Sequence, residues 1–213
     1  MALVNRKLIK LNNRGVRNVT TFGSVSGGSF TFIKKLTASS SGDLSFVNGS
    51  ASVVLDNTYK EYLFTFKNIH TNADQVDLTF NGSDDTSSHS YDITKTTTFF
   101  ESFHNEGDTS AELGYLAGAD LAQSTAVQPL GSGLGNANDE NLGGYLHLFN
   151  PSDTTFVKHF ISKINQSYRV GLPGSINQFV AGYFNTTAAI TAVQFKMESG
   201  NIDAGDICLY GIK

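Results

Sequence analysis

The segment 178–212 constrains the fold more than any other part of the sequence. It contains three short runs rich in apolar and β-branched residues, 178–184, 190–197 and 206–212, which polar turns separate. In the middle run, one side of the chain carries the mainly apolar residues Thr191, Val193, Phe195 and Met197. This period of two is typical of a strand with one buried and one solvated face. We expect three successive strands, with the turn 203–205 closing a hairpin between the last two.

Runs of the same kind recur along the rest of the chain. They predict further strands at 29–36, 44–47, 51–55, 61–69, 75–80, 90–103, 145–149 and 155–162. Asn48 and Gly49 are a favoured hairpin turn between two of these runs, and Phe30 with Phe32 or Ile33 is expected to point inward. We therefore predict an all-β fold, an antiparallel β-sandwich of jelly-roll type with about ten strands. It forms one domain over 29–213, preceded by an N-terminal extension.

The composition agrees with this fold class. The chain has 213 residues, of which 21 are Gly and 16 are Phe, with only 16% charged residues and no Trp. Such a composition is typical of a turn-rich β protein with a Phe-rich core. Cys208 is the single cysteine, so no intrachain disulfide framework can form, and we expect its thiol to be buried in the last strand. No run of 18 apolar residues is present, and we expect no membrane contact.

The charges divide the chain into a basic leading segment and an acidic body. Residues 1–42 contain seven Lys or Arg and no Asp or Glu, whereas the rest contains eight basic and 19 acidic residues. We interpret residues 1–28 as a docking arm that binds a partner through the following side chains: Arg6, Lys7, Leu8, Ile9, Lys10, Arg14 and Arg17. A first strand at 7–11 followed by a solvated linker is the alternative. Since no aromatic platform accompanies the basic residues, we expect no nucleic acid partner.

The stretch 104–143 breaks the strand pattern. It is rich in Gly and acidic residues, and its periodicity is weak. We predict a long surface loop there, with a short helix around 118–124. Loops of this length inside compact domains are often functional, although a surface excursion without a role also explains the composition.

No residue pattern points to catalysis or to a metal. Gly-x-Ser-x-Gly is absent, and the five histidines are dispersed without zinc-binding spacing: His70, His89, His104, His147 and His159. Acidic residues occur at 84–85, 101–108 and 139–140, and a glycosidase would need two of them about 5–10 Å apart. The spacing at 84–85 does not match a calcium-binding EF-hand loop. We expect no catalytic residue, no metal and no cofactor.

Several long phrases resemble one group of proteins. They are LTASSSGDLSFVNGS (36–50), LDNTYKEYLFTFKNIH (55–70), TKTTTFFESFHNEGDT (94–109), LHLFNPSDTTFVKHF (146–160) and the whole of 179–212. Together they are similar to the virion structural proteins of marine tailed phages, including cyanophages. The resemblance implies a structural protein on the virion exterior, either a tail-fibre-type or neck or tail accessory piece or a capsid decoration protein. It also implies folding in the host cytoplasm, binding to other virion proteins of the capsid, neck or tail, and homo-oligomers, with trimers frequent.

Two other functions stay open. A carbohydrate-binding module that recognises a host-surface glycan is the first. Since the chain has no Trp, tyrosines would have to stack on the sugar, and the candidates are Tyr115, Tyr145 and Tyr168. A glycan-degrading enzyme that uses acidic residues within 101–140 is the second.

Overall fold

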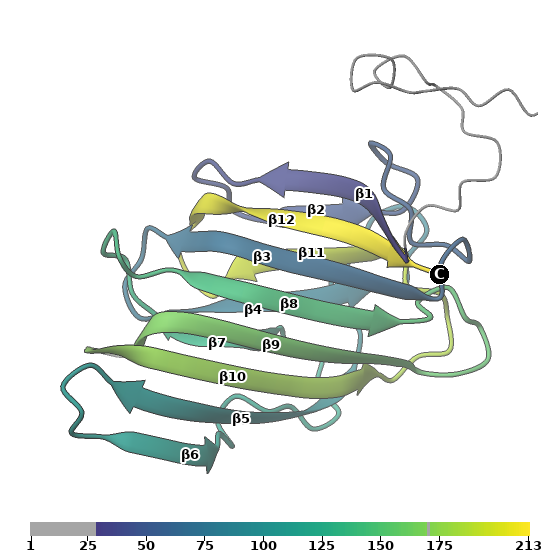
Figure 1. Cartoon of the computed structure of the whole chain (residues 1–213). Helices are drawn as coiled ribbons and strands as arrows, with labels where there is room; N and C mark the ends of the chain where they lie inside the picture. Colours follow the sequence, from purple (N-terminus) through teal and green to yellow (C-terminus); the bar gives the residue numbers. More distant parts are fainter. Residues whose placement is uncertain (1–28, 170) are drawn as a thin grey trace, which may run out of the picture.

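Residues 29–169 and 171–213 are described in a computed structural model of the chain (Figure 1). Their strands form two antiparallel sheets that lie face to face. The predicted antiparallel β-sandwich is therefore confirmed, with twelve strands instead of about ten. The predicted strand at 7–11 lies outside the described residues.

The larger sheet has eight strands, with β1 and β6 at its two edges. Their spatial order is β1 (Phe30–Thr37), β12 (Ile202–Ile212), β3 (Glu61–Thr71), β8 (Leu142–Phe149), β9 (Lys158–Arg169), β10 (Leu172–Phe184), β5 (Lys95–Asn105) and β6 (Ala111–Tyr115). The smaller sheet, behind it in Figure 1, has the order β2 (Leu44–Val47), β11 (Ala192–Met197), β4 (Val76–Ser83) and β7 (Gln128–Leu134).

Eight of the strands have the order of a jelly roll. Along the chain they follow one another as β1, β2, β3, β4, β7, β8, β11 and β12, with β1, β3, β8 and β12 in the larger sheet and the other four in the smaller one. The groups β1-β12-β3-β8 and β2-β11-β4-β7 are the two four-stranded sheets of a jelly roll. Two hairpins, β5–β6 and β9–β10, are inserted into this order and extend the larger sheet beyond β8. The outer face of the larger sheet is broad as a result.

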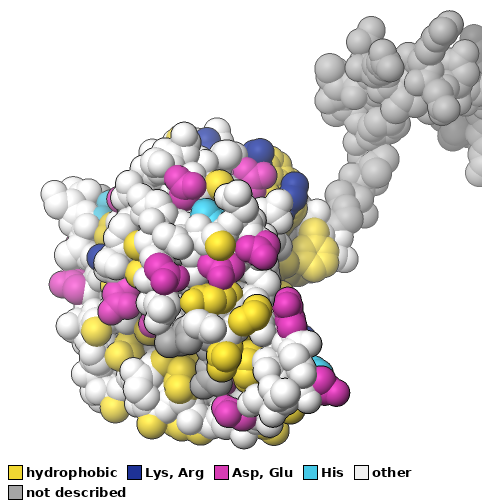
Figure 2. Space-filling model, turned by 90° about the vertical axis from the view of Figure 1, so that its left-hand side faces the viewer, with side chains coloured by type: hydrophobic (Ala, Val, Ile, Leu, Met, Phe, Trp, Pro, Cys, Tyr) yellow, Lys and Arg dark blue, Asp and Glu magenta, His cyan; other side chains and the backbone are white. Residues whose placement is uncertain are grey.

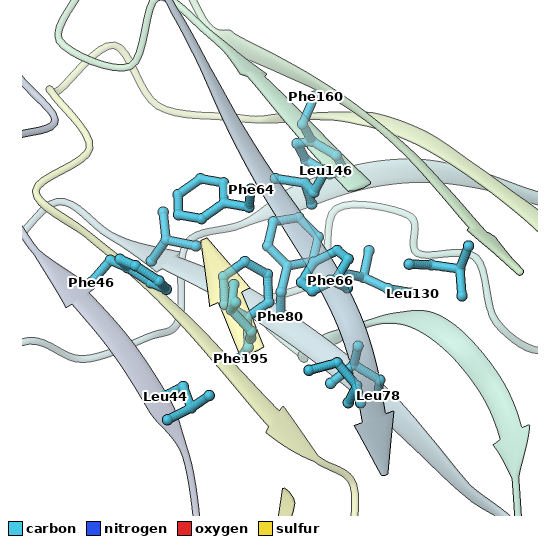
Figure 3. Close-up of a cluster of buried hydrophobic side chains, with 14 of the residues drawn as sticks. Leu44, Phe46, Phe64, Phe66, Leu78, Phe80, Leu130, Leu146, Phe160 and Phe195 are labelled. Carbon is cyan, nitrogen blue, oxygen red and sulfur yellow. The ribbon is translucent and has the colours of Figure 1, made fainter. Parts of the chain in front are cut away.

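The core between the sheets is organised around Phe195 (Figure 3). This ring, on β11, lies 5.2–6.3 Å from the rings of four other buried residues, centroid to centroid: Phe46, Phe64, Phe66 and Phe80. Val193 and Met197 are buried on the same side of β11, which confirms the predicted alternation. Buried side chains from both sheets belong to one cluster, so that the two sheets share a single hydrophobic core.

The three C-terminal strands exist as predicted, but their partners differ. β10 and β12 belong to the larger sheet and β11 to the smaller one, so the expected hairpin between the last two strands is wrong. Residues 203–205 are part of β12, which pairs with β1 and β3. The turn before β12 carries the chain from one sheet to the other. Alternation in a sequence identifies the buried face of a strand but not the sheet that it joins.

The predicted hairpin of 44–47 with 51–55 is also wrong. β2 pairs with β11, and 51–55 is a loop whose Val53 and Leu55 are buried. The loop is closed by hydrogen bonds from Gly49 N to Val53 O and from Leu55 N to the side-chain oxygen of Asn48, both 2.9 Å long. Apolar residues in this run therefore serve the core without forming a strand.

Two expectations about burial at the edge of the larger sheet are wrong. Phe30 and Phe32 are 58% and 56% exposed, whereas Ile33, the alternative inward residue, lies at a bulge between Phe32 and Lys34 and packs against the core, as does Leu36. Cys208, which we expect to be buried, is only half-buried, because its neighbours Ile207 and Leu209 occupy the inward positions of β12.

The segment 104–143 is not a long loop. It contains β6 and β7, and no helix is present in the described residues, including 118–124. Side chains from the larger sheet hold β7 in place. Gln178 accepts a hydrogen bond from Ser132 N (2.9 Å) and donates one to Ser132 O (3.2 Å), while Gln166 donates to the same oxygen (2.7 Å). These contacts join residues distant in sequence, which explains why local periodicity did not predict β7.

Candidate interaction surface

The outer face of the larger sheet carries apolar side chains over three adjacent rows, which we call the apolar face. Register places the first row across seven strands, and its members are Cys208, Thr65, Tyr145, Lys163, Phe179, Phe100 and Tyr115. The second row consists of Phe32, Tyr210, Leu63, His147, Ile161, Ala181 and Thr98. The third consists of Phe30, Ile212, Glu61, Phe149, His159, Tyr183 and Thr96.

Solvent reaches this face. The exposed fraction of its large side chains lies between 39% and 58% for Phe30, Phe32, Phe100, Tyr115, Tyr145 and Ile161. Charged groups on it are few and already paired. Lys163 Nζ lies 5.3 Å from the centre of the Phe179 ring, and Glu61 Oε2 lies 2.9 Å from His147 Nε2. The face is therefore apolar and nearly neutral.

Rings in the first row stack on one another. Phe100 and Phe179 are nearly parallel, with centroids 4.8 Å apart and an interplanar angle of 7°. Lys163, on the opposite neighbouring strand, covers the other side of Phe179. Both faces of the Phe179 ring are thus in contact with neighbours, and the stack stands as a ridge across the sheet.

A depression of about 460 Å³ lies beside this ridge. Its lining includes Ile161, Ala181, Thr98, His159 and Tyr183. The hollow lies over the small residues Ala181 and Thr98, in the row next to the ridge, and larger side chains such as Tyr183 and His159 also line it. Apolar side chains form most of its surface.

The other half of the outer face is more polar, although exposed Leu113 of β6 lies opposite Ser102. Asn165, Asn177 and Ser102 form the row next to the ridge. Beyond them, His104 Nε2 lies 3.0 Å from Asp108 Oδ1 at the end of the strands. Figure 2, which views the strands from this end, shows carboxylates spread over it and few Lys or Arg side chains. A polar rim therefore borders the apolar face on one side.

The structure brings two of the three candidate tyrosines into the same row. Tyr115 and Tyr145 both lie on the apolar face, whereas Tyr168 is half-buried on the opposite side of β9, near Gly135. The Tyr115 hydroxyl donates to the Asp120 carboxylate, and this hydrogen bond raises the pKa of Tyr115. The predicted docking residues Arg6, Lys7, Leu8, Ile9, Lys10, Arg14 and Arg17 lie outside the described residues.

Two of the acidic residues within 101–140, Glu101 and Glu112, line one small pocket where β5 pairs with β6. Glu101 is buried on the inner side of β5, where its Oε2 accepts a hydrogen bond from Gln178 (3.2 Å). Glu106 and Asp108 lie in the turn that follows β5. Glu106 and Asp108 line a different depression, together with His104.

The acidic pair at 84–85 stabilises loops. Asp85 accepts hydrogen bonds from the hydroxyl and the backbone N–H of Ser90, which lower its pKa, and Asp84 accepts one from Thr186 (2.9 Å). Across residues 29–169 and 171–213, no group of three or more His, Cys, Asp or Glu could hold a metal ion.

Sequence reasoning missed the apolar face and the buried lysines. A signal for the face was present, since Phe99–Phe100 and Phe160–Ile161 are consecutive apolar pairs within strands, and such a pair places one side chain on each face.

Lys95 is fully buried, and its ammonium group donates to Ile93 O (3.0 Å) and Ala126 O. Burial lowers its pKa to about 8.

No helix in the described part of the chain is long and apolar enough to cross a membrane. No protein family model matches the sequence, and comparisons with curated proteins and with solved structures find no match.

Proposed function

We propose that the protein is a structural protein on the exterior of a tailed-phage virion, acting by binding and not by catalysis. It is a tail-fibre-type or neck or tail accessory piece, or a capsid decoration protein, that docks on other virion proteins through residues 1–28. The sequence phrases similar to marine phage virion proteins support this placement. Jelly rolls also serve in viral capsids, which supports it by analogy of fold.

The apolar face is the observation that carries the proposal. Its six large exposed side chains are on average half exposed, and with roughly 200 Å² each they present about 600 Å² of mainly apolar surface. This value is at the upper end of the largest patch on a typical monomeric protein. Such a surface is characteristic of a protein that is covered by partners in an assembly. A core without disulfides also suits folding in a reducing host cytoplasm before assembly.

Incorporation into particles tests the proposal. A phage that encodes the chain without residues 1–24 should assemble particles that lack this protein in mass spectrometry of purified virions. The shortened protein, purified alone, should unfold at the same temperature as the full chain, which separates loss of docking from loss of folding. Unchanged incorporation of the shortened protein would remove the docking role of the segment.

Recognition of a host-surface glycan is the second candidate function. Its support is the shared row of Tyr115 and Tyr145, which are 56% and 39% exposed, together with the use of jelly rolls in lectins. Stacking on a sugar would fall to these two rings, because both sides of Phe179 are covered. Binding on a glycan array that is lost in Tyr115→Ala and Tyr145→Ala supports this candidate, and a folded sample without hits removes it.

A further inference from the structure

We infer that the apolar face packs against the same face of a second copy of this chain. The inference rests on the proposed role in an assembly, and it adds the surface and the partner. Two larger sheets would lie face to face at a spacing of about 10 Å, as the sheets of a sandwich do.

The size of the apolar face fits such a contact. Eight strands spaced by about 4.8 Å span about 34 Å, and the outer two of the three rows lie about 14 Å apart. With the width of the side chains, the face covers roughly 600–700 Å² in projection. A stable interface buries about 800 Å² on each partner, and the polar row of Asn165, Asn177 and Ser102 supplies the remaining rim.

The relief of the face is self-complementary. It carries a ridge, formed by Phe100 and Phe179, and next to it the hollow over Ala181 and Thr98. A second copy brings an identical ridge, which can fill the hollow of the first. Lys163 contacts the Phe179 ring and Glu61 lies next to His147 within the same face. Burying the face would therefore leave few charged groups without a neighbour.

Charge argues against the N-terminal segment as the occupant. Residues 1–28 contain five basic and no acidic residues. On the apolar face they would meet Lys163 and the two histidines His147 and His159, with Glu61 as the acidic partner. The segment would bring five basic groups onto a face whose one carboxylate, Glu61, already lies next to His147, whereas a second copy would bring an apolar and nearly neutral surface.

Analytical ultracentrifugation of the full chain, from about 1 to about 100 μM, tests the inference, because self-association follows mass action. We expect a concentration-dependent oligomer. Ile161→Lys, at the centre of the face, should weaken it at least about 100-fold, since a lysine would be buried in each partner. Val47→Lys is the matched control, because Val47 is a half-buried apolar residue on the outer side of β2 in the other sheet. It should leave the association unchanged.

Cys208 offers a second measurement that needs no substitution. Its thiol is half-exposed in the first row of the face. In the wild-type chain, the rate of maleimide labelling should fall as the protein concentration rises, because the second copy covers the thiol. The same rate at all concentrations would overturn the inference, even if Ile161→Lys does not fold.

Other outcomes also decide the question. A monomer at all concentrations, or an oligomer that Ile161→Lys leaves intact, overturns the inference. An oligomer lost only when residues 1–24 are removed assigns the contact to that segment and overturns it too. A monomeric protein that still enters particles refutes the self-association alone, whereas an oligomer absent from particles refutes the proposed function alone.

Discussion

Lys95 makes the stability of this protein depend on pH in an unusual direction. Its ammonium group is fully buried between β5 and the segment before β7, where it donates to two backbone carbonyls. Desolvation lowers the pKa of Lys95 from its ordinary 10.5 to about 8. Between these two values the unfolded chain holds a proton that the folded chain has lost. The unfolding free energy therefore rises with pH in this range. The destabilisation caused by the buried ammonium group is fully present below pH 8.

The magnitude follows from the two pKa values. Each unit is worth about 1.36 kcal/mol, so a shift of this size contributes up to about 3 kcal/mol. Between pH 7 and pH 10 the unfolding free energy of the wild-type chain should rise by about 2.5 kcal/mol relative to Lys95→Met, which lacks the titrating group. Tyr62, whose pKa burial raises to about 12, is present in both proteins and cancels in this difference.

Urea denaturation at pH 7, 8.5 and 10 measures this difference. Lys67→Met, which replaces an exposed lysine of β3, is the matched control, and its difference from the wild type should be the same at each pH. A difference between the wild type and Lys95→Met that changes by less than about 0.5 kcal/mol, or that changes in the opposite direction, would refute the reasoning.

Phe195→Ala should lower the unfolding free energy by about 4 kcal/mol, because it removes a buried ring that contacts four others, whereas exposed Phe156→Ala should cost less than about 0.5 kcal/mol. Equal losses in urea denaturation would contradict this. Gln178→Met should cost about 1–3 kcal/mol and speed hydrogen exchange at the Ser132 amide, and unchanged exchange would show that Gln178 does not hold β7. Cys208→Ser should change stability by less than about 1 kcal/mol, and a larger loss would indicate a buried thiol.

Local pattern predicted most of the strands, and in β11 also the buried face. Phe195 and its neighbours on β11 alternate so regularly that the inward side of this strand could be predicted from the sequence. The partners of each strand could not, because the assignment of β10, β11 and β12 to two sheets depends on contacts with strands far away in the chain. Hydrophobic alternation contains no information about such contacts.

Hydrophobic alternation in the sequence predicts irregular strands and the outer surface least well. β7 contains Gly131 and Gly133, and bonds from Gln166 and Gln178 fasten it to the larger sheet. Residue type alone makes Tyr115 and Tyr145 candidates for stacking on a sugar, whereas their common row follows from the register of five strands. The apolar face is likewise a product of register, since each of its three rows takes one residue from each of seven strands.

A density map of the intact virion tests the central claim most directly. The account predicts copies of this jelly roll on the particle exterior, with the outer faces of their larger sheets packed against each other and Ile161 inside the contact. Absence of the protein from the particle, or copies whose apolar faces are open to solvent, would contradict it.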